Sequence, residues 1–127
     1  QEIIKIVVDP SLSPEEAVRA FYTYLKARRM KEGFDLLSQE YLQKTNFEEW
    51  TNRFKDILDV DVILSEQYEK TKDTAFVKFS TKNWVDGEAE THYYEGTWKT
   101  IKEDGVYKML KSKIIEVEDP EMDWFWE

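Results

Sequence analysis

The sequence of 127 residues has no cysteine, one histidine and only four glycines. Without cysteine, the chain cannot form a disulfide-stapled scaffold, a catalytic thiol or a thiolate metal site. A single histidine excludes a metal site built from several imidazoles, and the scattered glycines form no glycine-rich phosphate loop. The sequence therefore predicts neither a bound metal ion nor a cofactor.

Positive charge and long apolar runs are also scarce. Lys and Arg total 18 against 27 Asp and Glu, which gives a net charge of −9. An acidic chain lacks the basic footprint that binds phosphates, so we expect no nucleic-acid partner. The aliphatic cluster at residues 3–8 is far shorter than the roughly 20 residues of a membrane helix, so no membrane span is predicted. What the chain does contain, 41% hydrophobic and 15% aromatic residues, suffices for a folded core.

The length fits one domain. We expect residues 1–127 to form it, with a core at about 13–117 and an acidic, aromatic tail at 118–127. The aromatic end of this tail either docks on a partner or folds back onto the domain, and we favour folding back because exposed rings promote aggregation. The chain begins at Gln1 and lacks cysteine, which is compatible with an exported or tethered domain that has lost an N-terminal segment, and equally with other locations.

Three amphipathic helices are predicted before residue 59. The first begins at Ser13, which is placed to cap it, and Glu16 completes a capping box. A short second helix is expected over 34–42. A third is expected from the Asn46 cap to about Leu58. Its apolar stripe recurs at helical spacing and consists of Phe47, Trp50, Phe54, Ile57 and Leu58.

After Asp59 the apolar period changes from helical spacing to two, which is typical of strands. The dipeptides at 86–87 and 104–105 are both Asp-Gly, a strong hairpin signal. They bound a long strand over 90–102 and a last strand from 106 to about 117, and residues 3–8 are a candidate edge strand. Four hairpin-linked strands form an antiparallel sheet, and the helices must cover one face of it. The predicted fold class is α+β, with three N-terminal helices packed against a sheet of four or more strands.

The order of these elements resembles the nuclear transport factor two-like superfamily, a cystatin-like α+β fold. So does the end of the sheet, where Gly96-Thr97-Trp98-Lys99 is followed by residues 103–109 with their Asp-Gly turn and with Tyr107 in place of the usual Trp. The resemblance covers about residues 13–117 and points to no specific member. It implies a curved sheet wrapped around the helices as a cone with an apolar pocket, and dimerisation through the outer face of the sheet. Members of this superfamily include isomerases, dehydratases, hydrolases, ligand binders and non-catalytic accessory domains.

Carboxylates are the only acid–base catalysts that the sequence offers. The resemblance implies that an enzyme of this kind would place an Asp, with a Tyr, in the apolar cone. The candidates are Asp35, Asp59, Asp61 and Asp86, with Tyr22 or Tyr24 as the partner. Alternation with two valines places the acids at 59 and 61 in water, and an Asp at 86 is explained by its turn. The sequence therefore assigns no catalytic residue and favours a non-catalytic domain.

Aromatic residues are the most interesting feature of the chain. Rings that line the mouth of a cone could grip an apolar small molecule with few polar contacts. His92 shares a strand face with Tyr94 and Trp98 and would point into the pocket if that face is concave. The predicted ligand-binding residues are Tyr24, Trp50, Phe54, His92, Tyr94 and Trp98. The alternative is that the rings fill the core and that His92 is a hydrogen-bonded sheet residue.

Three functions stay open at this point. The chain is a non-catalytic accessory or small-ligand-binding domain, a small-molecule isomerase, dehydratase or hydrolase, or a protein–protein interaction domain. A buried carboxylate that opens into the cone would favour the enzyme. Tyr93 and Ile101 lie on the strand face opposite to Tyr94 and Trp98, so whichever set faces the helices, the other faces outward and is apolar enough to predict a homodimer through this face. The predicted core consists of Phe21, Leu25, Leu37, Trp50, Phe54, Val62, Val77, Trp98 and Leu110.

Overall fold

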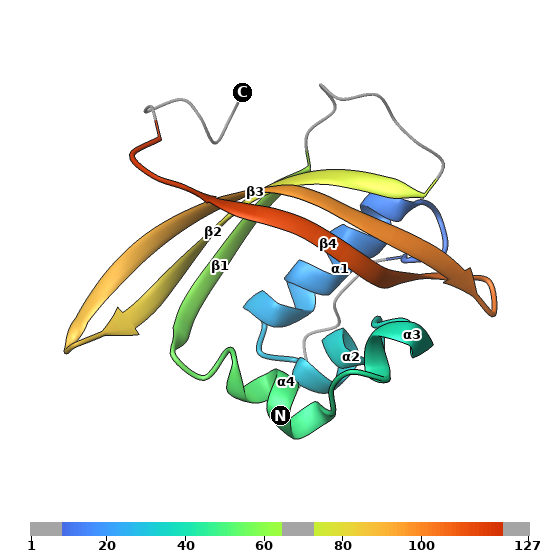
Figure 1. Cartoon of the computed structure of the whole chain (residues 1–127), viewed down its shortest axis with the longest axis horizontal. Helices are drawn as coiled ribbons and strands as arrows, with labels where there is room; N and C mark the ends of the chain where they lie inside the picture. The colour runs from blue at the N-terminus through green and yellow to red at the C-terminus, as the bar shows by residue number, and fades with distance from the viewer. Residues whose placement is uncertain (1–8, 65–72, 121–127) are drawn as a thin grey trace, which may run out of the picture.

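The computed structural model describes residues 9–64 and 73–120. Four short helices come first: α1 (Pro14–Lys26), α2 (Met30–Phe34), α3 (Gln39–Leu42) and α4 (Phe47–Asn52). Four strands follow: β1 (Ile57–Leu64), β2 (Thr74–Val85), β3 (Glu88–Glu103) and β4 (Val106–Val117). They pair in the order β1-β2-β3-β4 as one antiparallel sheet. The sheet arches over α1, and the other helices lie on the same side (Figure 1), so the predicted α+β cone is confirmed.

Two tight turns set the register of the long strands. Asp86 and Gly87 have φ angles of 48° and 80°, and Asp104 and Gly105 have 51° and 83°. Positive φ at both central residues is what a two-residue hairpin of type I′ requires, and Asp-Gly tolerates it well. Both predicted hairpins are therefore confirmed, and β3 extends slightly beyond its predicted bounds at both ends.

A close approach of two strands occurs in the middle of β3, at Gly96. A Cβ atom built on this glycine would lie 2.0 Å from the backbone oxygen of Lys113 on β4. No other residue type fits there without moving the neighbouring strand. Glycine at such a point lets a long strand bend, and the curvature of the sheet around α1 depends on bends of this kind.

The helical region is more broken than the sequence predicted. Asn46 does cap α4, since its side-chain oxygen accepts from the Glu49 N–H at 2.9 Å. However, α4 ends at Asn52, and residues 57 and 58 begin β1 instead of ending a helix. The backbone N–H of Trp84 donates to the Asp56 oxygen at 2.8 Å, so pairing with β2 begins here. Leu58, predicted to face inward, is 47% exposed as a result.

The predicted helix over 34–42 is wrong as a single element. Leu37 lies between α2 and α3 and forms an isolated parallel bridge with Met109 of β4. The Met109 N–H donates to the Leu36 oxygen at 2.7 Å, and its own oxygen accepts from the Ser38 N–H at 2.9 Å. These two bonds anchor the short helices to the sheet, and they require an extended backbone where the helix was expected.

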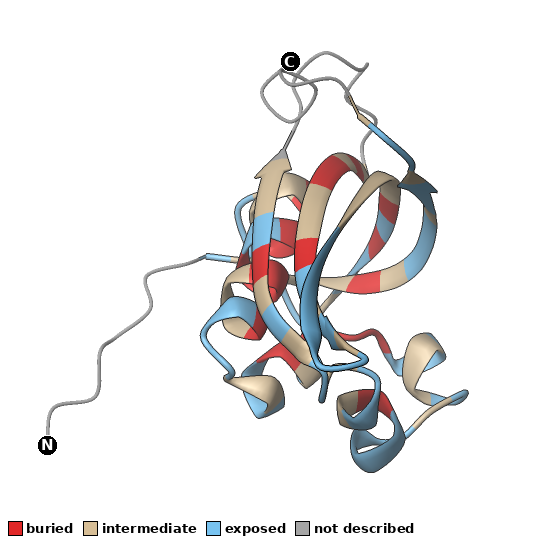
Figure 2. Cartoon of the chain, turned by 90° about the vertical axis from the view of Figure 1, so that its left-hand side faces the viewer, coloured by how far each residue is buried: buried red, intermediate tan, exposed pale blue. Residues whose placement is uncertain are grey.

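The core lies between α1 and the concave face of the sheet, where buried positions alternate along the strands (Figure 2). Six of the nine predicted core residues are buried: Phe21, Leu25, Leu37, Trp50, Val77 and Trp98. Phe54 and Val62 are partly buried and pack against this core. Leu110 is the poorest prediction, because the β3–β4 register shifts between Lys99 and Thr100. The shift gives the inward position to Met109, which is fully buried.

Two expectations lie outside the described residues, namely the edge strand at 3–8 and the aromatic end of the tail at 124–126. Across residues 9–64 and 73–120, no helix combines the length and apolarity needed to cross a membrane.

Candidate functional site

A cavity of about 330 Å³ lies inside the cone, between α1, α4 and the concave face of the sheet. This volume is within the range of small-molecule sites, roughly 300–1,000 Å³. Its wall is mostly apolar and aromatic. The aromatic residues that line it are Phe21, Tyr22, Tyr41, Trp50, Phe54, Phe79, Tyr94 and Trp98. Helical spacing on α1 and alternation on the strands bring these rings together.

The rings form a continuous wall because each one packs on its neighbours. The Phe21 centroid lies 5.3 Å from Tyr22 and 5.7 Å from Trp98. Tyr22 lies 4.8 Å from Phe79, which stacks on Tyr94 at 4.9 Å with an interplanar angle of 18°. Offset and edge-on contacts at these separations are favourable beyond the area that they bury. The wall is therefore a packed and ordered surface.

One buried hydrogen bond crosses this wall. The Trp98 indole N–H donates to the Tyr22 hydroxyl at 2.9 Å. Burial raises the pKa of Tyr22 well above its usual value, so the phenol stays protonated at physiological pH. Burial is also the main cause that raises the pKa of Tyr94. The Tyr22 hydroxyl therefore keeps a proton that it can donate to a ligand, and it is not a general base.

Four of the six predicted ligand-binding residues line the cavity: Trp50, Phe54, Tyr94 and Trp98. Tyr24 does not, because its Cβ faces α2, 3.7 Å from where a Cβ on Gly33 would lie. Tyr22 takes the position in the wall instead. The signal for this is helical spacing, since Tyr22 lies four residues after Val18 and three before Leu25, both of them buried.

His92 is absent from the cavity wall. Its Nδ1 lies 3.0 Å from the Glu116 carboxylate on β4, and its Nε2 lies 3.3 Å from Glu90. The hydrogen bond with Glu116, helped by Glu90, raises the pKa of His92 above its usual value of 6.5. The structure thus places His92 in the hydrogen-bonded sheet position that the sequence left as its alternative.

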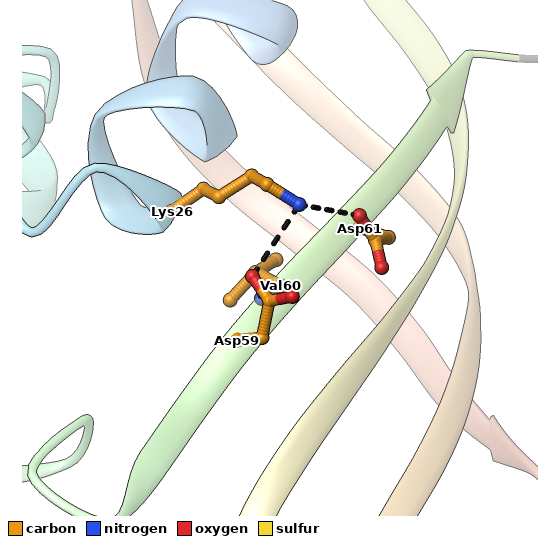
Figure 3. A network of polar contacts seen from close by, with 4 residues as sticks. All are labelled: Lys26, Asp59, Val60 and Asp61. Atoms are coloured by element: carbon orange, nitrogen blue, oxygen red, sulfur yellow. Dashed lines mark hydrogen bonds and ion pairs between the residues drawn. The ribbon is translucent and has the colours of Figure 1, made fainter.

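None of the candidate aspartates reaches the cavity. Asp59 and Asp61 lie on β1 on either side of Val60 and point to Lys26 at the end of α1 (Figure 3). The Lys26 ammonium is 3.3 Å from Asp59 and 2.5 Å from Asp61. The hydrogen bond with Asp61 raises the pKa of Lys26. Val60 is buried, as its alternation with these acids predicted.

The cavity wall as described contains no carboxylate. Asp35 and Asp86 are exposed, and the polar residues of the wall are the tyrosines, Thr81, Asn83 and Arg53. Within residues 9–64 and 73–120, no three His, Asp or Glu side chains gather as a metal site would require. The arrangement can enclose an apolar molecule and offer it a few hydrogen-bond partners, of which Arg53 alone is charged.

A second hollow of about 440 Å³ opens beside the first, between α3 and β4. Tyr41 and Arg53 line both spaces, so they stand where the cavity meets the hollow. We call this hollow the mouth. Its remaining lining residues are Glu40, Lys44, Thr45, Leu110, Lys111 and Ser112.

No family model matches the chain, and no curated protein matches it in sequence. Solved structures do match in fold. A ketosteroid isomerase-like protein from Erwinia carotovora atroseptica superposes with a TM-score of 0.63 at 15% identity, over 82% of this chain and 93% of the other. A proposed dehydratase of the NTF2-like family from Streptomyces avermitilis gives 0.56 at 11% identity, over 80% and 92%.

A proposed polyketide cyclase from Pseudomonas putida gives a TM-score of 0.56 at 15% identity, over 91% of this chain and 97% of the other. At such identities the likeness is one of fold, and fold alone does not carry function. The resemblance seen in the sequence and the cone seen in the structure agree with these matches. The chain has the fold of the nuclear transport factor two-like superfamily.

Proposed function

We propose that this chain is a small-ligand-binding domain that holds an apolar molecule in its aromatic cavity without transforming it. The observation that carries the proposal is a wall of packed rings without a carboxylate. Apolar walls with a few placed polar groups are typical of ligand pockets. Trp50, Phe54, Tyr94 and Trp98 supply contact area, and Tyr22 supplies a hydrogen-bond donor.

The alternative is an isomerase, dehydratase or hydrolase, and the names of the matching structures favour it. Proton transfer needs a base within hydrogen-bond reach of the substrate. Tyr22 is held neutral by burial, and Asp59 and Asp61 point away to Lys26. The polar residues that remain in the wall, Thr81 and Asn83 among them, are poor bases. We therefore prefer binding to catalysis.

Binding can be tested with a neutral apolar probe, N-phenylnaphthylamine, whose fluorescence rises in apolar surroundings. We expect saturable binding to the chain. Ile57→Trp should abolish it, because Ile57 lines the cavity and a larger side chain would fill it. Ile63→Trp is the matched control, since Ile63 lies on the same strand and alternates with the inward-facing Val62. Equal binding by both variants would contradict the proposal.

We also propose a homodimer through the convex face of the sheet. Trp84, Ile101 and Ile115 alternate with inward-facing residues on three strands and are 53%, 43% and 65% exposed. Pairing two such faces about a two-fold axis would bury these side chains. Light scattering should give the mass of a dimer, and the Ile115→Lys variant should give the mass of a single chain. A wild-type mass of one chain at every concentration would refute the dimer.

A further inference from the structure

The mouth of the cavity differs in charge from the rest of the chain. It carries three cations, Lys44, Arg53 and Lys111, against one acid, Glu40, whereas the whole chain has a net charge of −9. Within the described residues none of these three cations takes part in an ion pair. Three cations that form no ion pair, with one acid beside them, make this part of an acidic protein locally positive.

Arg53 connects this charge to the aromatic cavity. It follows α4 directly, and its N–H donates to the Trp50 oxygen at 3.2 Å. Trp50, three residues before Arg53, and Phe54, directly after it, line the cavity. Arg53 itself lines both the cavity and the mouth. A ligand that extends from the cavity into the mouth would therefore lie against Arg53.

We infer that the ligand of this cavity is an anionic amphiphile. Its apolar part lies among the aromatic rings, and its anionic head lies in the mouth against Arg53, with Lys44 and Lys111 adding to the attraction. The inference rests on the proposed binding function and specifies its ligand class.

The chemistry of the mouth favours an anion over a cation or a neutral group. A guanidinium donates two parallel hydrogen bonds to a carboxylate, sulfate or phosphate, and it gains more from them than from a neutral acceptor. A cationic head would be repelled by three like charges, with only Glu40 to offset them. The acidic surface elsewhere repels anions at long range, so an anionic ligand needs a site of this kind to approach.

The test compares four ligands that share one apolar chain: decanoate, decyl phosphate, decanol and decyltrimethylammonium. Each displaces N-phenylnaphthylamine from the wild-type protein, and the displacement gives its affinity. We expect at least one of the two anions to bind about tenfold more tightly than decanol, which corresponds to about 1.4 kcal/mol. The cation should bind more weakly than decanol. The anion advantage should shrink between about 50 mM and about 500 mM salt, because salt screens exposed charges.

Variants then identify the group responsible. Arg53→Gln should remove most of the anion advantage, taken as the ratio of anion affinity to decanol affinity in the same variant, and Lys44→Gln and Lys111→Gln should each remove a smaller part. Lys55→Gln is the matched control, because Lys55 is exposed and lies two residues after Arg53 but lines neither space. It removes the same charge and should change nothing. Thermal melting of each variant shows whether it is folded.

The possible outcomes distinguish a failure of this inference from a failure of the proposed binding function on which it rests. Equal affinity for the anions and decanol, with no effect of Arg53→Gln, overturns the anionic ligand class and leaves apolar binding intact. An equal loss in Arg53→Gln and Lys55→Gln also overturns it, because net charge would then explain the effect. If neither the naphthylamine nor any decyl ligand binds, the proposed function itself fails.

Discussion

The hydrogen bond between Trp98 and Tyr22 provides the sharpest stability test of the cavity wall. Both residues belong to the buried core, and each is 5% exposed. Tyr22→Phe removes the acceptor and leaves the indole N–H, which donates over 2.9 Å, without a partner in an apolar wall. The ring contacts with Phe21 and Phe79 remain, so little apolar burial changes. The expected loss is the cost of an unsatisfied buried donor, about 1–3 kcal/mol.

Urea unfolding followed by circular dichroism measures this loss. The midpoint should fall with an unchanged slope, since the surface exposed on unfolding stays the same. Tyr24→Phe is the matched control, because Tyr24 lies on the same helix, outside the cavity wall, and no hydrogen bond of its hydroxyl is found in the described structure. Its cost should stay below about 0.5 kcal/mol, as is usual for changes that break no buried contact.

A loss below about 0.5 kcal/mol in Tyr22→Phe would refute the reasoning, because it would mean that the indole N–H finds water when the hydroxyl is removed. The double variant with Trp98→Phe separates the bond from the packing. If the bond carries the effect, the two changes are not additive, and the second costs less once the first is made. Full additivity would assign the loss to packing alone.

Three further predictions concern the core, the sheet and the histidine. Trp50→Ala should cost about 3–5 kcal/mol in urea unfolding, because Trp50 is fully buried and packs on Phe54; a loss under about 1 kcal/mol would place α4 off the core. Gly96→Ala should be strongly destabilising in a thermal melt, since its Cβ would meet the β4 backbone, whereas Gly87→Ala, in an open turn, should cost only the strain of positive φ. The pKa of His92 is raised in the folded protein. The stability that its ion pairs contribute is therefore fully present below the ordinary pKa of 6.5 and is lost as the pH rises through the pKa of the folded state. The stability difference between wild type and His92→Gln should therefore be larger at about pH 5.5 than at about pH 8.5, and a difference that does not vary with pH would contradict the ion pairs.

The sequence predicts most of the sheet because its signals are local. Each Asp-Gly turn needs positive φ at both of its residues, and only a few residue pairs tolerate that. The Asn46 cap is equally local, since the bond spans three residues. The signal that ends α4 is not local. Phe54, Ile57 and Leu58 suit a helix stripe as well as a strand, and pairing of Trp84 with Asp56 decides between them.

The candidate site is less predictable for the same reason. Alternation shows which strand residues share a face with Trp98, but not how far along the cone each one lies, and His92 therefore falls outside the wall. Helical spacing favours Tyr22 over Tyr24, but it does not show that Tyr22 accepts a hydrogen bond from Trp98, 76 residues away. The charged mouth joins Arg53 after α4 to Lys111 on β4, and no spacing along the chain brings these residues together.

The contact of Lys26 with Asp59 and Asp61 bears on how this protein avoids aggregation. β1 is at one edge of the four-stranded sheet, and an edge strand offers unpaired backbone groups to any other strand. Here that strand carries two carboxylates that one lysine from α1 holds in place. A second chain that added to this edge would have to displace the lysine and approach both acids. Asp59 and Asp61, two of the aspartates considered as catalytic candidates, thus form with Lys26 a charged group at the edge strand, and such charges oppose the addition of another strand.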